Sequence, residues 1–522
     1  MSTNQNCQKD CAMSDARQPV GMLSGRNRSR AGSERLIGAL SLALALGACA
    51  VGPDYMTPSL VLPAKFGAAD QASTSAKPQL SRWWARFNDP LLNSLIEEAV
   101  QGNLDVATAK ARVKEARATY RQTVGTLFPT IRNTDSATRQ KSTSKASGGS
   151  DASSSQTIDQ FQAGLDASWE IDLFGKNQRG TEAARYGVEA TDEQLRLALL
   201  TLVGDVASNY VQARGYQARI ALAQRTAAAQ RETGQLTLTR FEAGAASAVD
   251  VANSAGQTSS TEAAIPSLEV AYAAAVHRLS VLTGRAPGDL TARMKRGGPI
   301  PRPKLPMPAG IPADILSSRP DVRQAERLLA QSSARIGQAE AARYPTVSLT
   351  GNIATTGLKV GDLAKSSSIG WSFGPTLSVP LFNGGQLKAA VEVAQAQRDQ
   401  NFVGYQAAVL RALEEVENAL VATAQERIRY QRLVASAEAY RQATTLSRSL
   451  YQGGSIDFLR VLDAERSLYS AEDALVASRI TLATNYIALN KALGGGWDGV
   501  INASKPEIID ADMGPRLAVN HP

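Results

Sequence analysis

The chain is 522 residues long, more than one compact hydrophobic core usually serves, so two or more structural units are expected. Hydrophobic residues are an ordinary 43% of the chain but aromatic residues only 5%, which favours closely packed helices with small side chains over a bulky globular core. The formal charge of +8 is not gathered into basic patches with interleaved aromatic residues, so nucleic-acid binding is not expected. Two histidines, and three cysteines that all lie before residue 50, argue against a zinc site and a disulfide framework.

The N-terminal segment has the features of a secretion signal. Residues 36–48 form a 13-residue apolar run behind several arginines. This run is too short for a transmembrane helix, which needs about 20 residues. It ends in the sequence LGAC at residues 46–49, and small residues before a cysteine are typical of a bacterial lipoprotein signal. We therefore expect residues 1–48 to be removed and Cys49 to carry a covalent lipid. An unmodified cysteine behind an ordinary cleaved signal is the alternative.

The residue after Cys49 indicates the membrane to which the protein is sent. Lipoproteins kept in the inner membrane typically have Asp at this position, whereas this chain has Ala50, which favours the outer membrane. Three acyl chains on the cysteine would anchor the protein firmly, since each buried methylene contributes about 0.8 kcal/mol. No cofactor other than this lipid is expected. The stretch before Arg26 is long for a signal, so Met22 is an alternative translation start.

The body of the chain contains a degenerate duplication. The motif FPT at residues 128–130 recurs as YPT at 344–346, and RFEAG at 240–244 recurs as LYQGG at 450–454. A proline-rich segment separates the two halves. Because the order of features is the same in both halves, we expect one structural unit to occur twice. The predicted units are residues 49–300, residues 301–500 and a C-terminal equatorial or flexible tail at 501–522.

Each half contains signals for a pair of long strands. Residues 161–173 alternate apolar with polar or small side chains, and so do residues 369–381. A shorter run spans 347–353, and the segment after Phe128 is polar and only a weak candidate. We expect strand pairs at about 128–175 and 344–382.

The expected strands are long enough to cross a membrane. Thirteen residues span about 43 Å, and a strand of that length crosses the apolar band of an outer membrane, about 25 Å tall, even when tilted. Residues 142–155 and 357–368 would form the outer loops. Half-buried strands of a soluble sandwich are the alternative. Four strands cannot close a barrel, and an open edge in lipid leaves backbone groups unpaired, so the barrel must be shared between subunits.

The helices between the strands are unusually long. Residues 181–240 contain no proline and would extend about 90 Å, and residues 386–450 form a second long run. Two shorter segments carry strict seven-residue repeats, which predict left-handed coiled packing. The repeats are Val251, Thr258, Ile265, Tyr272 and Leu279 in the first half, and Val461, Leu468, Leu475, Leu482 and Leu489 in the second. An ordinary coiled-coil rod is the alternative to a helical tube.

Four sequence segments carry a specific resemblance. They are CAVGPDY at residues 49–55, WWARFNDPL at 83–91, SSRPDV at 317–322 and ALGGGW at 492–497. Together with the duplication, they resemble the TolC/OprM/NodT family of outer-membrane factors over roughly residues 49–500. The resemblance implies an α+β membrane protein. Its trimeric 12-stranded β-barrel, with four strands per chain, would continue into a long 12-helix periplasmic α-barrel with a small mixed equatorial domain.

The resemblance also implies a function and partners. The chain would be the outer-membrane channel subunit of a tripartite efflux pump and would give drugs or other toxic small molecules a passive, gated exit. A homotrimer in outer-membrane lipid would engage a periplasmic adaptor (a membrane fusion protein) and an inner-membrane transporter of the resistance-nodulation-division type. Metal-ion export, type I protein export and a structural coiled-coil lipoprotein are alternatives. An enzyme is not expected, because no converging catalytic set and no phosphate-binding loop is found.

The candidate gate lies at the predicted ends of the helix pairs. Glycines at 244, 453 and 454 interrupt the helical pattern where the chain must reverse, so we expect Gly244, Gly453 and Gly454 to mark the tip of the tube. By position, Asp250 and Tyr451 match a TolC pair that links neighbouring helices in the closed state.

A second candidate pair lies further along the last helix. By position, Asp463 and Arg466 match an OprM-type carboxylate and arginine near the constriction. Three copies of the carboxylate would form a negative ring on the threefold axis. An ordinary surface pair at i, i+3 is the alternative. Ile456 stands where TolC has an arginine, so the TolC set of links cannot be carried over whole. No catalytic or metal-binding residue is expected.

Overall fold

The computed structural model describes residues 50–58, 80–145, 153–303 and 318–497. The chain divides after Cys49, and all described residues belong to the unit that begins at Ala50. The predicted signal peptide, Cys49 and the tail at 501–522 lie outside the described residues.

The described elements are mostly helical. In chain order they are η1 (Trp83–Phe87), α2 (Pro90–Gly102), α3 (Leu104–Gly125), β1 (Thr130–Lys145), β2 (Ser153–Ile171), α4 (Lys176–Glu242), α5 (Ala248–Leu282), α6 (Thr291–Met294), α7 (Pro320–Ala341), β3 (Thr346–Gly357), η3 (Val360–Ala364), η4 (Ser366–Ser368), β4 (Ile369–Ser378), α8 (Gln386–Gln452) and α9 (Phe458–Ala492). The labels η mark short 3-10 turns. None of the described helices combines the length and the apolarity that a membrane-spanning helix requires.

The element bounds confirm the duplication. Helices α3 and α7 both have 22 residues, and they start 216 positions apart. Helices α4 and α8 both have 67 residues, and α5 and α9 both have 35, with starts 210 positions apart in each case. The unit boundaries near residues 300 and 500 remain a prediction.

The four strands form one antiparallel sheet in the order β1-β2-β3-β4. Leu165, Ile353 and Trp371 lie in register on three adjacent strands and are exposed on one face. The next row, Asp166 and Asn352, lies on the opposite face, where the Asn352 amide donates to the Asp166 carboxylate over 2.6 Å. The alternation predicted for three of the strands therefore produces one apolar and one polar face.

The strand bounds differ from the prediction at several ends. β1 is 16 residues long despite its polar sequence, and its pairing with β2 continues to Lys145 opposite Ser153. The expected loop at 142–155 is therefore wrong at both ends, because backbone ladder bonds form whether or not the side chains alternate. β4 ends at Ser378 instead of near 381, since Pro380 cannot donate to a ladder. The stretch 357–368 contains the two short turns η3 and η4.

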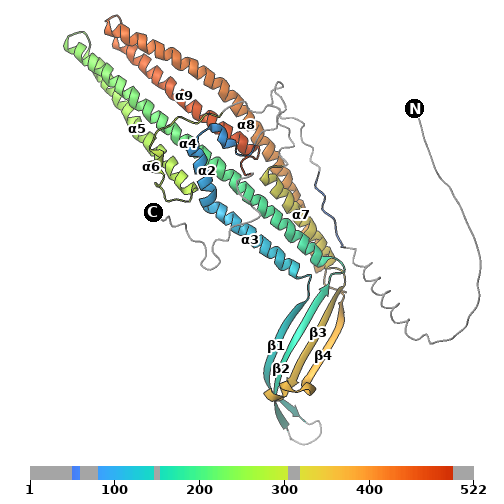
Figure 1. The fold of residues 1–522 in the computed structure, drawn as a ribbon. Coiled ribbons are helices and arrows are strands. Elements are labelled where there is room, and N and C mark those ends of the chain that lie inside the picture. The colour runs from blue at the N-terminus through green and yellow to red at the C-terminus, as the bar shows by residue number, and fades with distance from the viewer. Residues whose placement is uncertain (1–49, 59–79, 146–152, 304–317, 498–522) are drawn as a thin grey trace, which may run out of the picture. The chain divides into compact units, whose positions relative to one another are not determined.

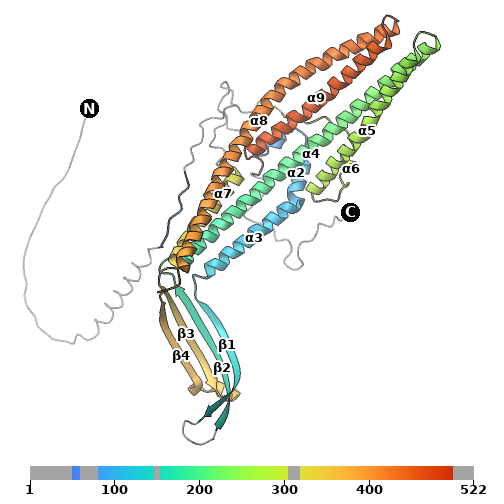
Figure 2. The same ribbon diagram turned by 180° about the vertical axis from the view of Figure 1, so that it is seen from behind.

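The long helices pack as two antiparallel hairpins. α4 packs against α5 and α7, α8 packs against α9 and α7, and α4 also contacts α9. Figures 1 and 2 show the α4–α5 and α8–α9 turns at the helix ends that lie away from the strands. None of the ten predicted heptad positions is exposed, so the seven-residue repeat is confirmed as the packed side of α5 and α9.

The two shorter helices α2 and α3 begin with ordinary N-terminal caps. Asp89 accepts from the backbone N–H groups of Leu91 and Leu92 at the start of α2, with Pro90 at the first helical position. The Asn103 side chain does the same for α3. α2 packs against α4, where the Tyr210 hydroxyl donates to the Asp89 carboxylate over 2.7 Å.

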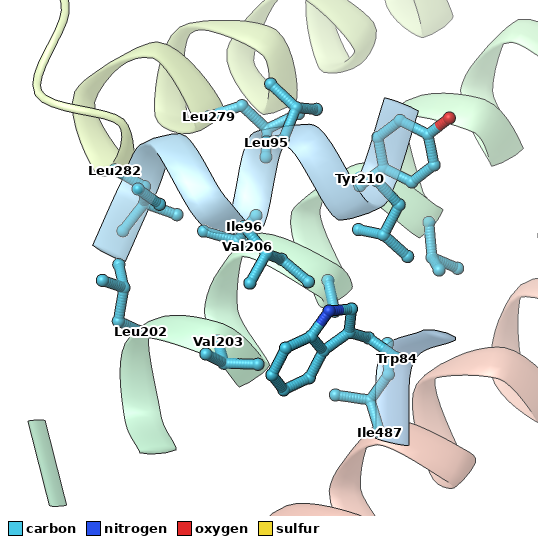
Figure 3. Packing of buried hydrophobic residues seen from close by; sticks show 14 of the residues in the cluster. Trp84, Leu95, Ile96, Leu202, Val203, Val206, Tyr210, Leu279, Leu282 and Ile487 are labelled. Atoms are coloured by element: carbon cyan, nitrogen blue, oxygen red, sulfur yellow. The ribbon is translucent and has the colours of Figure 1, made fainter. Parts of the chain in front are cut away.

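The main hydrophobic core lies where η1 and α2 cover α4, α5 and α9. Figure 3 shows Trp84, Leu95 and Ile96 packed on Val203, Val206 and Tyr210 of α4, with Leu279 of α5 and Ile487 of α9 closing the cluster. The three aromatic side chains of η1, Trp83, Trp84 and Phe87, are all buried. This core joins both halves of the duplication, since α4 belongs to the first and α9 to the second.

Candidate functional site

The two hairpin turns repeat one backbone geometry. Gly244 follows α4 and Gly454 follows α8, and both have φ of +74°, a left-handed conformation that favours glycine. In each turn a backbone N–H reaches five residues back, from Ala245 to the Arg240 carbonyl and from Ser455 to the Leu450 carbonyl. Gly453 has φ of −78° and requires no glycine conformation. The three predicted glycines therefore lie in the turns, but only two of them need the left-handed region.

Asp250 is engaged within its own helix start. Its carboxylate accepts from the Ser247 N–H over 3.0 Å and from the Ser247 hydroxyl over 2.8 Å. In return the Asp250 N–H donates to the Ser247 hydroxyl oxygen over 3.1 Å. This reciprocal capping box satisfies the free N–H groups at the start of α5 and leaves the carboxylate partly exposed.

Tyr451 is buried at the tip of the other hairpin. Its ring packs edge-on against Phe458, with 6.0 Å between centroids, in a small cluster with Val461 and Leu462. Its hydroxyl donates to the Thr237 hydroxyl oxygen on α4 over 3.2 Å. Tyr451 therefore links α8 to α4 instead of to the Asp250 side chain, and within the chain the predicted pair is not brought together.

Arg240 adds a second link between the two hairpins at this level. Its guanidinium lies 4.6 Å from the centre of the Tyr451 ring and also donates to the Tyr451 carbonyl oxygen. It reaches the Gly454 turn as well, where an added Cβ would lie 3.1 Å from Arg240 Nη2. In the sequence, Arg240 stands out only as part of a repeated motif. Its counterpart in the repeat is Leu450, so the duplication carries no signal for a link.

Asp463 and Arg466 are both exposed, and they do not pair with each other among the described residues. Arg466 Nε donates instead to the Gln257 side-chain oxygen of α5 over 2.5 Å. Asp463 has no hydrogen-bond or ion-pair partner in the described part of the chain. The i, i+3 surface pair is thus not formed here, and the carboxylate is free to meet something outside the chain.

A buried polar layer lies at the same level of α9, around Glu465. The Glu465 carboxylate accepts from the Thr233 hydroxyl over 2.8 Å and from Arg448 Nε over 2.9 Å. It therefore connects α9 with α4 and α8 across an interior with few large side chains. Beside it lies a cavity of about 160 Å³, which Glu465, Arg448 and Gln230 help to line. Both polar atoms of the Gln230 amide are buried without a protein partner.

A further ion pair crosses the same interface nearer the core. Arg219 of α4 holds Asp473 of α9 through two hydrogen bonds, of 2.7 and 2.9 Å. The hydrogen bond to Asp473 raises the pKa of the Arg219 guanidinium above its ordinary value, against the opposing effect of burial. Two parallel bonds of this kind fix geometry as well as charge.

The hairpins are thus tied together by a ladder of polar contacts of different strengths. Exposed ion pairs contribute about 0–1 kcal/mol each, so the exposed links can rearrange when a partner binds. The buried pair at Glu465 costs more to break. Within the described residues, no group of three His, Cys, Asp or Glu side chains is placed to hold a metal ion.

Comparison with known proteins gives this architecture a family. The profile of the family described as outer membrane efflux protein matches residues 95–285 and 311–495, one stretch in each half of the duplication. The chain belongs to the outer membrane efflux protein family. Both matched stretches include a helical hairpin and a strand pair, so the family signal covers the tip contacts as well as the sheet.

Individual members of the family are similar over nearly their whole length. The chain is 34% identical to the probable efflux pump outer membrane protein TtgC of Pseudomonas putida, covering 88% of this chain and 95% of the relative. It is 32% identical to the cation efflux system protein CusC of an Escherichia coli O6:H1 strain, covering 87% and 97%. The structure of the outer-membrane channel OprN superposes with a TM-score of 0.80 at 34% identity, covering 86% of this chain and all of that one.

Proposed function

We propose that this outer membrane efflux protein is the exit duct of a tripartite pump and works as a homotrimer. Each chain would supply four strands to a 12-stranded barrel in the outer membrane and long helices to a 12-helix tube in the periplasm. A periplasmic adaptor and an inner-membrane transporter of the resistance-nodulation-division type would complete the pump. The transporter supplies the energy, so the duct itself is passive and is not an enzyme.

The observation that carries this proposal is the sheet. In the described residues β1 pairs only with β2 and β4 pairs only with β3, so both edges of the sheet are unpaired. One face exposes large apolar side chains, with Trp371 77% and Phe373 70% exposed. An apolar face suits lipid, but unpaired edges in lipid cost several kcal/mol per backbone group, so the edges must meet those of other copies. Three copies of four strands give twelve.

The helices support the same assembly. α8 exposes Val403, Leu410, Ile428 and Leu446, each by more than half, along a helix whose other side is packed against α7 and α9. A row of exposed aliphatic side chains on one helix is uncommon on a free surface and is typical of an interface. Neighbouring copies in a tube would cover this row.

The candidate gate fits the closed end of such a tube. Asp463 is exposed and has no partner among the described residues, and three copies around an axis would form a negative ring. Arg466, which is bonded to Gln257 here, would hold α9 against α5 next to that ring. At the turns marked by Gly244, Gly453 and Gly454, the partly exposed Asp250 would add a contact between neighbouring chains. The buried Tyr451 would instead hold α8 to α4 within each chain. An adaptor that engages these turns would open the duct.

A lipid on Cys49 would anchor the trimer in the outer membrane. Drugs or other toxic small molecules are the proposed cargo, because the relative ArpC of Pseudomonas putida, which is 33% identical to this chain, is named as part of an antibiotic efflux pump. Metal ions are the second candidate, because the relative CusC is named as part of a cation efflux system.

Two measurements test the assembly and the cargo. Light scattering of the detergent-purified protein should give a mass of three chains, and a monomer with intact helical content would overturn the shared barrel. Expression in a strain deprived of its own outer-membrane efflux channel, together with the cognate adaptor and pump, should restore tolerance of amphiphilic drugs. Restored tolerance of metal cations alone would overturn the drug assignment in favour of cations.

A further inference from the structure

A cavity of about 500 Å³ lies between α8, α9 and the segment 298–303, which is neither helix nor strand. Its lining comes from residues 301–303 of that segment, 423–431 of α8 and 479–486 of α9, two helices that run side by side (Figure 1). Small-molecule sites typically enclose about 300–1,000 Å³. Arg479 lies 16 positions after Asp463 on α9, about 24 Å along the helix, so the cavity is separate from the candidate gate.

The charged side chains in the lining of this cavity are all cations. Arg302, Arg427 and Arg479 line it, and none of the described residues around it is Asp or Glu. A concave surface with walls of low polarity focuses the field of such charges and raises the local concentration of anions. The cavity is therefore suited electrostatically to an anion and unsuited to a cation.

The three cavity arginines lack the partners that other arginines of the protein have. Arg219 and Arg319, for example, are each held by a carboxylate over 2.7 Å. In the described part of the chain, none of the three cavity guanidinium groups has a hydrogen-bond acceptor or an ion-pair partner. Arg479 Nε is moreover buried without a partner. Since a buried N–H without an acceptor costs free energy, an acidic group in this cavity would satisfy a donor that the chain leaves open.

The wall formed by residues 298–303 is held in place. Ile300 is buried in the main hydrophobic core, and Pro301 beside it is also buried. Just before this segment, Arg214 of α4 donates to the Arg296 carbonyl oxygen over 2.7 Å. The prolines at 299, 301 and 303 fix the backbone φ angle and carry no N–H, so the wall is stiff and offers apolar surface. The cavity is thus preformed.

The remaining lining is mostly apolar and aromatic. Tyr430 of α8 and Leu482 and Ala483 of α9 extend the apolar surface of the prolines. Tyr486 is buried, and its ring packs edge-on against Phe87 of η1 with 5.3 Å between centroids, so the main core fixes its position. Guanidinium groups bind carboxylates strongly, whereas the other walls favour apolar groups. A ligand that fits both carries an acidic group on an apolar body.

The internal repeat shows that the helix packing does not require these arginines. The positions that correspond to Arg427 and Arg479, 210 residues earlier, hold Gln217 and Glu269. The Gln217 amide donates to the Tyr272 hydroxyl oxygen over 3.1 Å and to the last carbonyl oxygen of α6 over 2.7 Å. The equivalent place in the first half is therefore closed by hydrogen bonds within the chain. The arginines of the second half have no such structural role and are available to a ligand.

We propose that the cavity is a binding site for a small organic anion, a molecule with one carboxylate on an aromatic or aliphatic body. Arg427 and Arg479 donate to the carboxylate from α8 and α9, and Arg302 adds a third positive charge. Tyr430 and Leu482 contact the body of the ligand. A bound anion bridges α8, α9 and the segment 298–303 and stabilises their arrangement. This site goes beyond the proposed exit duct, because its ligand is selected by these side chains and not by the pump.

Isothermal titration calorimetry of the purified full-length protein tests the chemistry of the ligand. The probes are 2-naphthoate and 2-naphthamide, which share a ring system and a shape but differ in charge, and titration into detergent alone corrects for partition into micelles. We expect saturable binding of 2-naphthoate that weakens as the salt concentration rises, and binding of 2-naphthamide at least about tenfold weaker. Equal affinity for both probes, or no saturable binding of 2-naphthoate, would overturn the proposal.

Three variants test the location of the site. Arg427→Gln and Arg479→Gln should each weaken 2-naphthoate binding at least about tenfold, and Arg427 is exposed, so its loss does not threaten the fold. Ala483→Met keeps all three arginines but fills part of the cavity and should weaken binding as well. Arg411→Gln removes an exposed arginine from the same helix, about 24 Å away, and is the matched control.

The thermal midpoint gives a second readout of the same variants. Saturating 2-naphthoate should raise the midpoint of wild type and of Arg411→Gln but not that of Arg427→Gln, since a ligand stabilises only the protein that binds it. Wild-type affinity in both cavity arginine variants would overturn the location. An equal loss of affinity in Arg411→Gln would show attraction by the overall charge of the chain and would overturn it too.

Discussion

The Arg240 guanidinium lies over the Tyr451 ring, 4.6 Å from its centre, and donates to the carbonyl oxygen of the same residue. One side chain of the first hairpin thereby holds both the ring and the backbone at the turn of the second. A contact between a cation and an aromatic face contributes about 0.5–2 kcal/mol, depending on solvent exposure. The link at the hairpin tips is thus strong enough to persist against thermal motion and weak enough for a binding partner to break.

Arg240→Ala should loosen the contact between the two turns. We expect amide exchange at residues 449–456 to rise about tenfold, as a loss of about 1.4 kcal/mol implies, with no change in exchange around the Trp84 core. Arg231 lies on the same helix as Arg240 and forms an exposed ion pair with Glu262 of α5, so Arg231→Ala serves as the control. Unchanged exchange at the α8–α9 turn would show that Arg240 does not hold it.

The ion pair between Glu465 and Arg448 should respond unequally to the loss of either residue. Glu465 is 5% exposed and Arg448 37% exposed, so Arg448→Ala strands a buried carboxylate whereas Glu465→Ala leaves a cation that can turn to water. We expect Arg448→Ala to destabilise the protein by about 2–4 kcal/mol and Glu465→Ala by about 1–2 kcal/mol. The thermal midpoints of the detergent-solubilised variants give the order, and the reverse order would contradict the burial argument.

The two faces of the sheet should tolerate charge differently. Trp371 lies on the apolar face in register with Ile353, and its neighbour Ser372 lies on the polar face opposite Asn352. Trp371→Arg should cost about 2–4 kcal/mol if the apolar face meets lipid at mid-depth, whereas Ser372→Arg should be nearly neutral. The fraction of protein in the outer membrane and the yield of folded oligomer measure the difference. Equal tolerance of both would contradict a lipid-facing apolar side.

Glu193 gives the protein a specific pH dependence. Burial raises the pKa of this carboxyl above its ordinary value, although Arg196 and Arg323 partly oppose the shift. The unfolded chain therefore releases this proton at lower pH than the folded protein does. Its contribution to stability is complete below the unfolded pKa and is lost as the pH rises through the folded one. Glu193→Gln should lessen the loss of stability as the pH rises above about 4. Thermal melts over a rising pH series should show a smaller fall for the variant than for wild type, and parallel curves would contradict the argument.

Much of the fold could be predicted because the periodic features of the chain are strong. The heptads of α5 and α9, the alternation in β2 and β4 and the repeated motifs each report a local constraint that tertiary contacts do not override. β1 could not be bounded in this way, because its long ladder with β2 depends on backbone bonds and not on the pattern of its side chains.

The candidate site was only partly accessible to such reasoning. The glycines of the two turns were found from their place in the repeat, since a chain reversal demands left-handed backbone. The roles of the side chains could not be found in this way. Asp250 caps its own helix and Tyr451 packs under Arg240, and these choices follow from rotamers and from the approach of α4 to α8, which no one-dimensional pattern encodes. Contacts that need a second copy of the chain remain predictions.

The most direct test of the gated duct is single-channel conductance of the purified protein in a planar bilayer, wild type beside the double variant Asp463→Ala with Arg466→Ala. A closed duct predicts a small wild-type conductance that rises sharply when the carboxylate ring and its neighbouring arginine are removed. A correctly folded oligomer that conducts in neither form would contradict the channel. Equal, measurable conductance in both would keep the channel and remove the gate from these two residues.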